Sequence, residues 1–330
     1  MRFSNMHAQI KMSSCLRDLN IEHQLTGNKI KIRTGELTSL IARLSGVLSW
    51  VEQSAVQTSF HQHGSEFQDD VFASCSLQSF VAKVQCHWLT EILREKRLRT
   101  VFQPIVSCVT DGTGIYGYEA LMRGDDAGRT IDPLDLLNVA RGADLLFQLD
   151  VLACRNAVLE AARYQIPTKL FINVTPTTIY NSEYHIDTVV GLLDGLGLNP
   201  RQIVLELVES EEVGDWYNFG RILDMYRDRG FEVALDDFGA GYSSMITFNR
   251  LRPDYIKIDM DIIRAVHLDA HRATLAGKLI EAAQELNIKT IAEGIESAGE
   301  FSWVRQRGVD FVQGFYISRP AAPPPFALAA

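Results

Sequence analysis

Two adjacent aspartates raise the question of what chemistry this chain performs. Asp236 and Asp237 follow a short apolar run in the segment VALDDFGAGYSS, residues 233–244. Neighbouring carboxylates repel each other, and burying either one without a partner costs several kcal/mol. A positively charged group or ion is therefore expected beside them. The following stretch, FGAGYSS, is interpreted either as a mobile element near that site or as a plain turn.

Similar polar side chains end other apolar runs of the chain. They are Glu119 in YGYEALM, Asn173 in KLFINVT, Glu206 in IVLELVE and Glu293 in KTIAEGI. For any one of them, a helix N-cap or a buried hydrogen-bonded group is the alternative. Carboxylate and amide oxygens together suit Mg²⁺ or Mn²⁺, and the lack of His and Cys argues against zinc. Two such ions, about 3.5–4 Å apart, would clamp an in-line phosphoryl displacement.

Lys257 is the one cation among these residues and lies in the segment YIKID, residues 255–259. Its ammonium could hold an attacking water or a phosphate oxygen. The alternative is that it neutralises Asp259, two residues later. Both readings stay open at the level of the sequence.

The segments that carry these residues alternate with helical patterns from about residue 101 onward. Eight strands are predicted at residues 101–106, 116–122, 169–175, 203–209, 231–238, 255–259, 289–295 and 311–317. Strands that are apolar on both faces and alternate with helices favour a parallel sheet covered by helices. Their number and spacing fit a (β/α)₈ barrel, whose active site gathers at the carboxyl ends of the strands. An open doubly wound sheet is the alternative, weakened by the lack of a GxGxxG motif.

Residues 1–90 lack this rhythm and are predicted to form a small α+β module of unknown role. A helix at about residues 86–98 connects it to a barrel over residues 91–322, and residues 323–330 form a flexible tail. The HQH stretch at residues 61–63 is interpreted as surface histidines rather than a metal site. No nucleotide, haem or flavin motif is visible in the module.

The composition narrows the function classes. The chain has 330 residues and a formal net charge of −9, which argues against a DNA or RNA polymer as partner. Five scattered cysteines without CxxC spacing are typical of reduced thiols. No apolar run is long enough to span a membrane, and no signal-peptide pattern begins the chain. A cytoplasmic location is therefore expected.

The polar strand ends also resemble a known family. The run YGYEALMRG contains the Glu119-Ala120-Leu121 signature of EAL-domain cyclic di-GMP phosphodiesterases. The accompanying motifs occur in the family's order: FQPIV, FINVTP, VLELVES, ALDDFGAGYSS, YIKID, IAEGIES and VQGFYISRP. The resemblance covers about residues 90–320. It implies a modified (β/α)₈ barrel with an antiparallel first strand, a detail that periodicity alone does not reveal.

The resemblance implies hydrolysis of cyclic di-GMP to linear pGpG with Mg²⁺ or Mn²⁺, two ions per site. By motif, the ligands of the first ion are Glu119, Asn173, Glu206 and Asp236. Asp236 and Asp237 serve the second ion, with Glu293 close by. Lys257 and Glu293, with Glu119, are assigned to catalysis, where the first two place or deprotonate the attacking water.

Further residues acquire roles only through the resemblance. Substrate binding falls to Gln103, Arg123, Asp259, Glu296 and Gln313, with Glu296 matching a guanine-contacting position. Glu209 matches a residue that anchors the DDFGAGYSS loop. The departures are conservative, such as Ala240 where Thr is common and Phe315 where Tyr is common, and none removes an expected ligand.

The residues favour a phosphodiesterase over two alternatives. One is a catalytically silent receptor that binds cyclic di-GMP and signals through the N-terminal module. The other is an unrelated barrel enzyme that acts on another phosphate ester. The resemblance also implies a homodimer through the barrel, and the N-terminal module is expected to take a regulatory ligand or a protein partner. No GGDEF-type signature accompanies the EAL motifs.

Overall fold

The computed structural model describes residues 1–34, 40–41, 44, 47–58, 75–109, 114–126, 128–180, 182–208, 215–239 and 244–326. The chain divides into two compact units that interleave in sequence. Unit 1 contains Met1–Arg97 and Gly124–Leu149, and unit 2 contains Leu98–Arg123 and Asp150–Ala330. The predicted limits of a separate N-terminal module, residues 1–90, stay a prediction.

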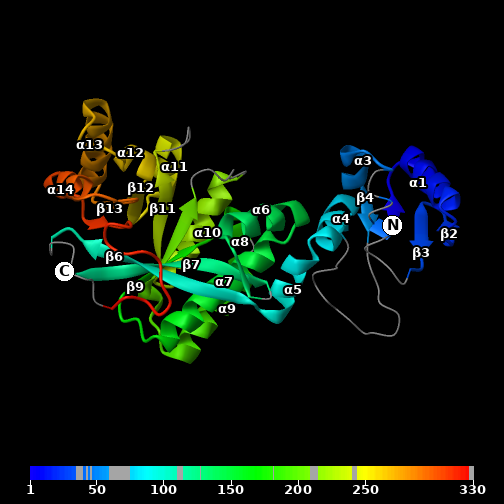
Figure 1. Ribbon diagram of the computed structural model, residues 1–330, viewed down its shortest axis with the longest axis horizontal. Coiled ribbons are helices and arrows are strands. Elements are labelled where there is room, and N and C mark those ends of the chain that lie inside the picture. Colours follow the sequence, from blue (N-terminus) through cyan, green and yellow to red (C-terminus); the bar gives the residue numbers. More distant parts are fainter. Residues whose placement is uncertain are drawn as a thin grey trace. The chain divides into compact units, whose positions relative to one another are not determined.

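Unit 2 contains a closed barrel of eight strands with helices on the outside (Figure 1). The strands are β6 (Leu98–Ser107), β7 (Ile115–Asp126), β9 (Lys169–Asn173), β10 (Ile203–Val208), β11 (Glu232–Phe238), β12 (Tyr255–Ile258), β13 (Lys289–Ala292) and β14 (Phe311–Val312). Pairing of β6 with β7 closes the ring. All eight predicted strands are confirmed, although the last one spans only two residues.

The direction of the first strand distinguishes this barrel from a regular one. The pairings of β7 through β14 around the ring are parallel, whereas β14 pairs with β6 antiparallel, Val312 lying opposite Val106. The antiparallel first strand implied by the family resemblance is therefore confirmed. The open doubly wound sheet is excluded, because the ring is closed.

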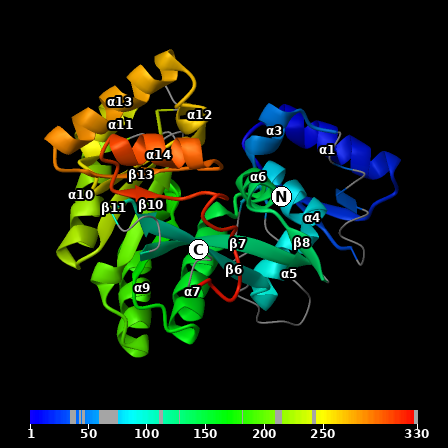
Figure 2. The ribbon, with the colours of Figure 1, turned by 60° about the vertical axis from the view of Figure 1, so that its left-hand side comes forward.

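Helices cover the outside of the barrel, as Figure 2 also shows. They are α7 (Leu146–Arg163), α8 (Pro176–Tyr180), α9 (Ser182–Leu196), α10 (Trp216–Asp228), α11 (Ser244–Leu251), α12 (Met260–Ile263), α13 (Ala270–Glu285) and α14 (Ala298–Gln306). Their apolar faces and the outer faces of the strands share one large core. Gly197 and Gly230 follow α9 and α10 with φ of +69° and +97°, the left-handed geometry expected of C′ glycines.

Unit 1 combines a small sheet with helices. The sheet has the order β2 (His23–Thr26), β3 (Lys29–Ile32), β1 (Arg2–Phe3), β4 (Val56–Thr58) and β5 (Cys75–Ser76). The helices are α1 (Met6–Asp18), α3 (Trp50–Ser54), α4 (Leu77–Gln85), α5 (His87–Glu95) and α6 (Pro133–Ala143), and the short strand β8 (Arg129–Ile131) pairs with the end of β7. The α+β character predicted for the N-terminal region is confirmed.

Several smaller expectations have outcomes. None of the five cysteines forms a disulfide. In the part of the chain that the structure describes, no helix is both long enough and apolar enough to cross a bilayer. The HQH stretch at residues 61–63 lies outside the described residues.

Candidate metal and active site

An apolar layer inside the barrel determines which side chains reach the mouth above it. Seven strands each contribute one residue to this layer: Ile105, Phe171, Val204, Ala234, Tyr255, Ile291 and Phe311. Side chains alternate between the faces of a strand, so the residue two positions further on also faces inward. On the parallel strands, these next inward positions are Asn173, Glu206, Asp236, Lys257, Glu293 and Gln313. On the reversed strand β6 the equivalent residue is Gln103, two positions before Ile105.

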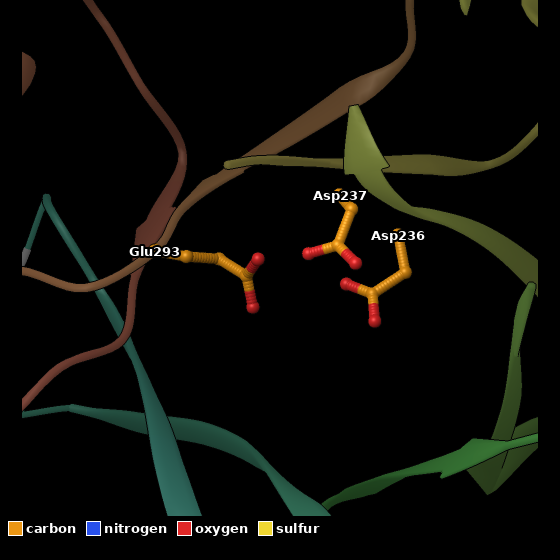
Figure 3. A group of neighbouring side chains, drawn as sticks. All are labelled: Asp236, Asp237 and Glu293. Carbon is orange, nitrogen blue, oxygen red and sulfur yellow. The ribbon is translucent and has the colours of Figure 1, made fainter. Parts of the chain in front are cut away.

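A break in the regular strand brings both adjacent aspartates into the same site. The pairing of β11 with β12 shifts register between Leu235 and Phe238, which marks a bulge. Asp237 within it has a φ of +54°, in the left-handed region that Asp tolerates better than most residues. The carboxylates of Asp236 and Asp237 therefore lie side by side, facing Glu293 (Figure 3). Each of these three residues offers an oxygen, and the three atoms lie within 4.8 Å of one another.

Lys257 lies at the centre of the acidic layer. Its side chain is 1% exposed, and its Nζ contacts four carboxylates. The distances are 2.8 Å to Glu293 Oε1, 2.9 Å to Asp236 Oδ1, 3.0 Å to Glu206 Oε1 and 3.5 Å to Glu119 Oε2. Neutralising Asp259 alone is therefore not its role, and one ammonium is shared among four acids.

Glu119 is held by two amide side chains. Asn173 Nδ2 donates to Glu119 Oε1 at 2.9 Å, and Gln313 Nε2 donates to Glu119 Oε2 at 2.6 Å. Gln313 Nε2 also contacts Gln103 Oε1 at 3.1 Å, and Gln103 Nε2 donates to the carbonyl of Ser318. Strands far apart in the sequence therefore share one polar network at the mouth.

The pKa of one acid in this layer, Glu119, is lowered, whereas the pKa values of Glu206, Asp237 and Glu293 are raised. Burial raises the pKa of Glu119, but Lys257 and the two amide donors outweigh it, so the pKa lies below its ordinary value. Burial raises the pKa of Glu206 well above its ordinary value despite Lys257. Burial and Asp236 raise the pKa of Asp237 to about 6. The pKa of Glu293 rises to about 8, mainly through burial, and Asp236 and Glu119 add to the rise.

The pKa of Lys257 lies well above its ordinary value. Burial alone would lower it, and the four surrounding carboxylates more than compensate. Lys257 therefore carries its charge throughout the physiological pH range.

Buried oxygens without hydrogen bonds indicate that the site suits cations. Both carboxylate oxygens of Glu206 and Oδ1 of Asp236 are buried without a hydrogen-bond partner. Lys257 Nζ lies 3.0 Å from Glu206 Oε1 and 2.9 Å from Asp236 Oδ1, whereas Glu206 Oε2 has no hydrogen-bond partner among the described residues. A buried anionic oxygen is costly unless a cation or donor compensates it. The all-oxygen donor set fits Mg²⁺ or Mn²⁺.

The remaining predicted substrate residues lie around this layer. Arg123 donates from Nη1 to the carbonyl of Met122. Asp259 caps α12 by accepting from the backbone N–H of Asp261, and its charge also raises the pKa of Asp237. Glu296 is exposed and forms a two-pronged ion pair with Arg264. Glu209 and residues 240–243 of the DDFGAGYSS loop lie outside the described residues.

Two buried acids that position the site were not anticipated from the sequence. Asp150 Oδ2 accepts from the backbone N–H and Oγ1 of Thr175 and from Oγ1 of Thr178, at 2.6–2.9 Å. This fixes the turn that follows Asn173. The sequence shows Thr175 and Thr178 as residues that can cap a helix. It does not show that their partner is Asp150, which lies on a different helix, α7.

Glu300 plays a comparable part after β13. It accepts from the backbone N–H groups of Ala265, Glu296 and Ser297. The capping box that it forms with Ser297 is visible in the sequence as S-x-x-E. The hydrogen bond that Glu300 accepts from Ala265 joins two segments distant in the sequence, so it is not visible in the sequence.

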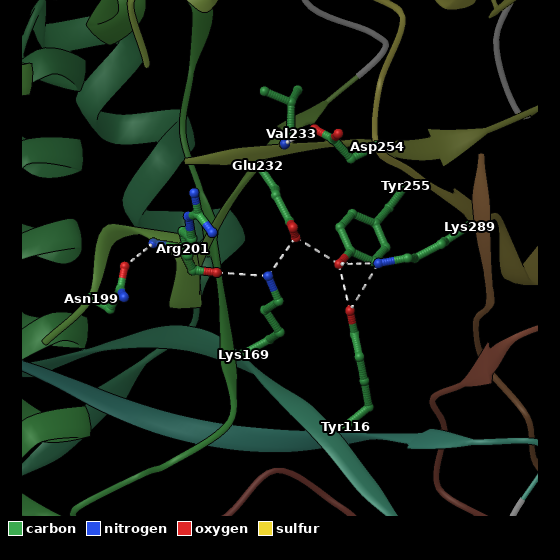
Figure 4. Close-up of polar contacts among 9 residues, drawn as sticks. All are labelled: Tyr116, Lys169, Asn199, Arg201, Glu232, Val233, Asp254, Tyr255 and Lys289. Carbon is green, nitrogen blue, oxygen red and sulfur yellow. Dashed lines mark hydrogen bonds and ion pairs between the residues drawn. The ribbon is translucent and has the colours of Figure 1, made fainter. Parts of the chain in front are cut away.

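The opposite end of the barrel is closed by a different polar cluster (Figure 4). Glu232 Oε2 accepts from Lys169 Nζ and Tyr255 OH, both at 2.7 Å, and Tyr255 OH lies 2.5 Å from Tyr116 OH. Lys289 Nζ lies 4.9 Å from the centre of the Tyr255 ring. These residues begin their strands, so the cluster lies at the end away from the acidic layer.

Comparisons with known proteins agree with this architecture. A model of the EAL domain matches residues 87–320. The chain is 30% identical over 238 residues to a probable cyclic di-GMP phosphodiesterase, PdeN, of Escherichia coli (strain K12). The match covers 70% of this chain and 45% of that relative, so the chain spans less than half of its length.

Two solved structures share the fold. One is a standalone versatile EAL protein from Vibrio cholerae O395 in a c-di-GMP bound form, with 32% identity and a TM-score of 0.63. The match covers 70% of this chain and 95% of that one. The other is a calcium and cyclic di-GMP complex of Klebsiella pneumoniae BlrP1, with 27% identity and a TM-score of 0.62. It covers 74% of this chain and 64% of that one.

Proposed function

The chain belongs to the EAL domain family, and from that premise we propose that it hydrolyses cyclic di-GMP to linear pGpG with two divalent ions. The observation that carries the proposal is the acidic layer around Lys257. Four carboxylates, from Glu119, Glu206, Asp236 and Glu293, contact one ammonium there, and Asp237 lies beside Asp236 and Glu293. With all five acids ionised, the site has an excess of four negative charges, which two divalent cations would neutralise.

We assign the ligands of the two ions as the family resemblance implies. Glu119, Asn173, Glu206 and Asp236 would hold the first ion, and Asp236 and Asp237 the second, with Glu293 beside them. The buried Glu206 Oε2, which has no hydrogen-bond partner among the described residues, supports this assignment. When bound, Mg²⁺ or Mn²⁺ ions would stabilise charge on the attacking and leaving oxygens.

The chain's own residues would position and deprotonate the attacking water. Lys257 keeps its proton, so it can donate to the water or to a phosphate oxygen but cannot act as base. Glu293 Oε1 lies 2.8 Å from Lys257 Nζ, and burial raises the pKa of this carboxyl to about 8 while no ion is bound. Once divalent ions displace that proton, the carboxylate could accept a proton from the attacking water.

Substrate contacts would come from the rim of the mouth. Arg123 would bind a phosphate through its planar fork of donors, since among the described residues its guanidinium donates only to the carbonyl of Met122. Gln313 bonds both Gln103 and Glu119, so the two glutamines would line the substrate site while Gln313 also positions the metal ligand.

The first test is turnover of cyclic di-GMP with Mg²⁺, with Mn²⁺ and with a chelator, resolved by product. We expect metal-dependent pGpG from the wild-type chain and a loss of at least about 100-fold in Glu119→Gln. Glu160→Gln is the matched control, because the ion pair of Glu160 in the described part of the chain is with exposed Arg163 on α7. Binding without turnover would indicate a receptor, and turnover of generic phosphodiesters without preference would indicate an unrelated enzyme.

The remaining expectations stay predictions. They are a homodimer through the barrel, a regulatory ligand or partner of the N-terminal region, and a cytoplasmic location. The identity of the preferred ion also belongs to the metal series of this test.

A further inference from the structure

The strongest feature outside the acidic layer is the pairing of Glu296 with Arg264 at the rim. Arg264 Nη1 lies 2.5 Å from Glu296 Oε2, and Arg264 Nη2 donates to Glu296 Oε1 at 2.8 Å. The guanidinium therefore contacts both carboxylate oxygens at once, the fork-to-fork geometry of a bidentate pair. The two side chains are 38% and 48% exposed, so solvent and ligands can reach them.

A guanine base presents nearly the same pattern of donors. Its N1–H and N2–H groups lie side by side on the Watson–Crick edge, and a carboxylate recognises them with both oxygens. Arg264 and a guanine edge would therefore compete for the same lone pairs of Glu296. One carboxylate cannot make both two-pronged contacts in the same plane.

The backbone around this pair is held independently of the ion pair. Glu300 accepts from the N–H groups of Ala265 and Glu296, and Arg272 donates from Nη1 to the carbonyl of Arg264. The side chain of Arg264 can therefore swing away while the two loops stay in place. Arg319 is the other cation near Glu296, but its guanidinium lies 4.2 Å from the centre of the Phe315 ring.

We infer that Arg264 is an internal competitor that occupies the guanine-reading carboxylate of Glu296 until substrate displaces it. This inference rests on the proposed function, since it takes a guanine dinucleotide as the ligand. It makes Arg264 a residue that sets affinity and base selectivity while leaving the chemical step unchanged.

The test compares Arg264→Ala and wild type in the full chain with Mg²⁺. Exposed ion pairs are weak, so we expect KM for cyclic di-GMP to fall about two- to fivefold with kcat unchanged. Direct binding of cyclic di-GMP with Ca²⁺ should tighten by a similar factor. Arg264→Lys, which keeps the charge and loses the fork, should lie between them. Arg163→Ala, which removes an arginine of the surface pair on α7, is the matched control.

Two further arms make the inference specific. Cyclic di-AMP lacks two adjacent donors on its base edge, so its binding should not tighten in Arg264→Ala. In a Glu296→Gln background, the gain from Arg264→Ala should disappear. A raised or unchanged KM in Arg264→Ala would overturn the inference, because the pair would then position Glu296 or have no effect. If the wild type neither binds nor hydrolyses cyclic di-GMP, the proposed function fails and this inference falls with it.

Discussion

Asp237 combines an unusual backbone with an unfavourable charge. It lies in the left-handed region and beside Asp236 and Asp259, which together with burial raise its pKa to about 6. Local strain and repulsion of this kind persist where surrounding structure and function maintain them. The residue is therefore kept at a cost in stability that an ion would offset.

Asp237→Asn should separate these two effects. Asn tolerates the left-handed backbone and can donate to Asp259, so removal of the charge should stabilise the chelated protein by about 1 kcal/mol at pH 8. Hydrolysis of cyclic di-GMP should fall by at least about 100-fold. Thermal unfolding with chelator and a turnover assay measure the two effects. Asp237→Ala, which disfavours that backbone, should be less stable than Asp237→Asn, and a destabilised Asp237→Asn would contradict the argument.

Glu293 predicts how stability depends on pH. Its pKa is raised from an ordinary 4.5 to about 8, mainly because the carboxyl is buried, and the charges of Asp236 and Glu119 add to a rise that Lys257 only partly opposes. The folded chain therefore holds a proton there that the unfolded chain has lost. The stabilisation from this group is complete below pH 4.5 and is lost as the pH rises through about 8.

Divalent ions should reverse that loss, because they replace the proton. We expect Mg²⁺ to raise the Tm more at pH 8 than at pH 6, measured against a chelated sample at each pH. In Asp237→Asn, which lacks one proposed ligand, the Tm shift caused by Mg²⁺ should differ less between pH 6 and pH 8. Equal shifts of the wild type at both pH values would show that protons and ions do not compete in this site.

The turn between β9 and α8 illustrates how an element supports the site. Asp150, on α7, receives three hydrogen bonds from Thr175 and Thr178, and it is 5% exposed. Asn173 lies two residues before this turn and bonds Glu119. The position of a predicted metal ligand therefore depends on an acid from another helix.

Asp150→Ala should loosen that turn. Leaving a backbone N–H and two hydroxyls unpaired in the core should cost about 3 kcal/mol of unfolding free energy. The Mg²⁺ concentration for half-maximal turnover should rise about tenfold, through Asn173. Thr178→Val removes one of the three bonds and should cost only about 1 kcal/mol. Denaturant titration and a metal series provide the measurements, and an unchanged metal dependence would show that Asn173 is positioned without this turn.

The elements were predictable to the extent that their periodicity is local. Strands apolar on both faces identified the eight barrel strands, and the helical patterns between them identified the alternation of strand and helix. The direction of β6 was not visible, because an apolar strand reads the same in either direction and only the resemblance implied it. The bulge at Asp237 depends on the pairing of β11 with β12, and the hydrogen bonds from Thr175 to Asp150 join segments 25 residues apart. Local sequence patterns do not reveal either contact.

At the scale of the whole molecule, unit 1 draws on two separate stretches of chain. α6, in the second stretch, buries Leu136, Ala140 and Ala143, and it packs against α4 and α5 from the first stretch. The sequence suggested a module that ends near residue 90, because the rhythm of the barrel begins soon afterwards. The alternation of predicted strands and helices does not show that residues 124–149 cluster with residues 1–97.

A truncation tests this division. A chain that begins at residue 98 would strip α6 of both partner helices, and uncovering Leu136 alone should cost about 2 kcal/mol. We expect the truncated chain to have a lower Tm and to aggregate more than the full chain. Thermal unfolding and size-exclusion chromatography measure these two effects. Leu136→Ser in the full chain should show a milder form of the same loss. A truncated chain as stable and monodisperse as the full one would show that α6 needs neither helix.

The interleaving also bears on how such a chain can be recombined. The polypeptide passes between the two units three times, at residues 97–98, 123–124 and 149–150. β7, the strand that carries Glu119, spans the second of these passages. A gene fusion that replaces only residues 1–97 would leave residues 124–149, the other part of unit 1, without the segment with which they pack. Shuffling of unit 1 between relatives therefore requires two segments to be exchanged together, and the barrel strand between them must remain in register.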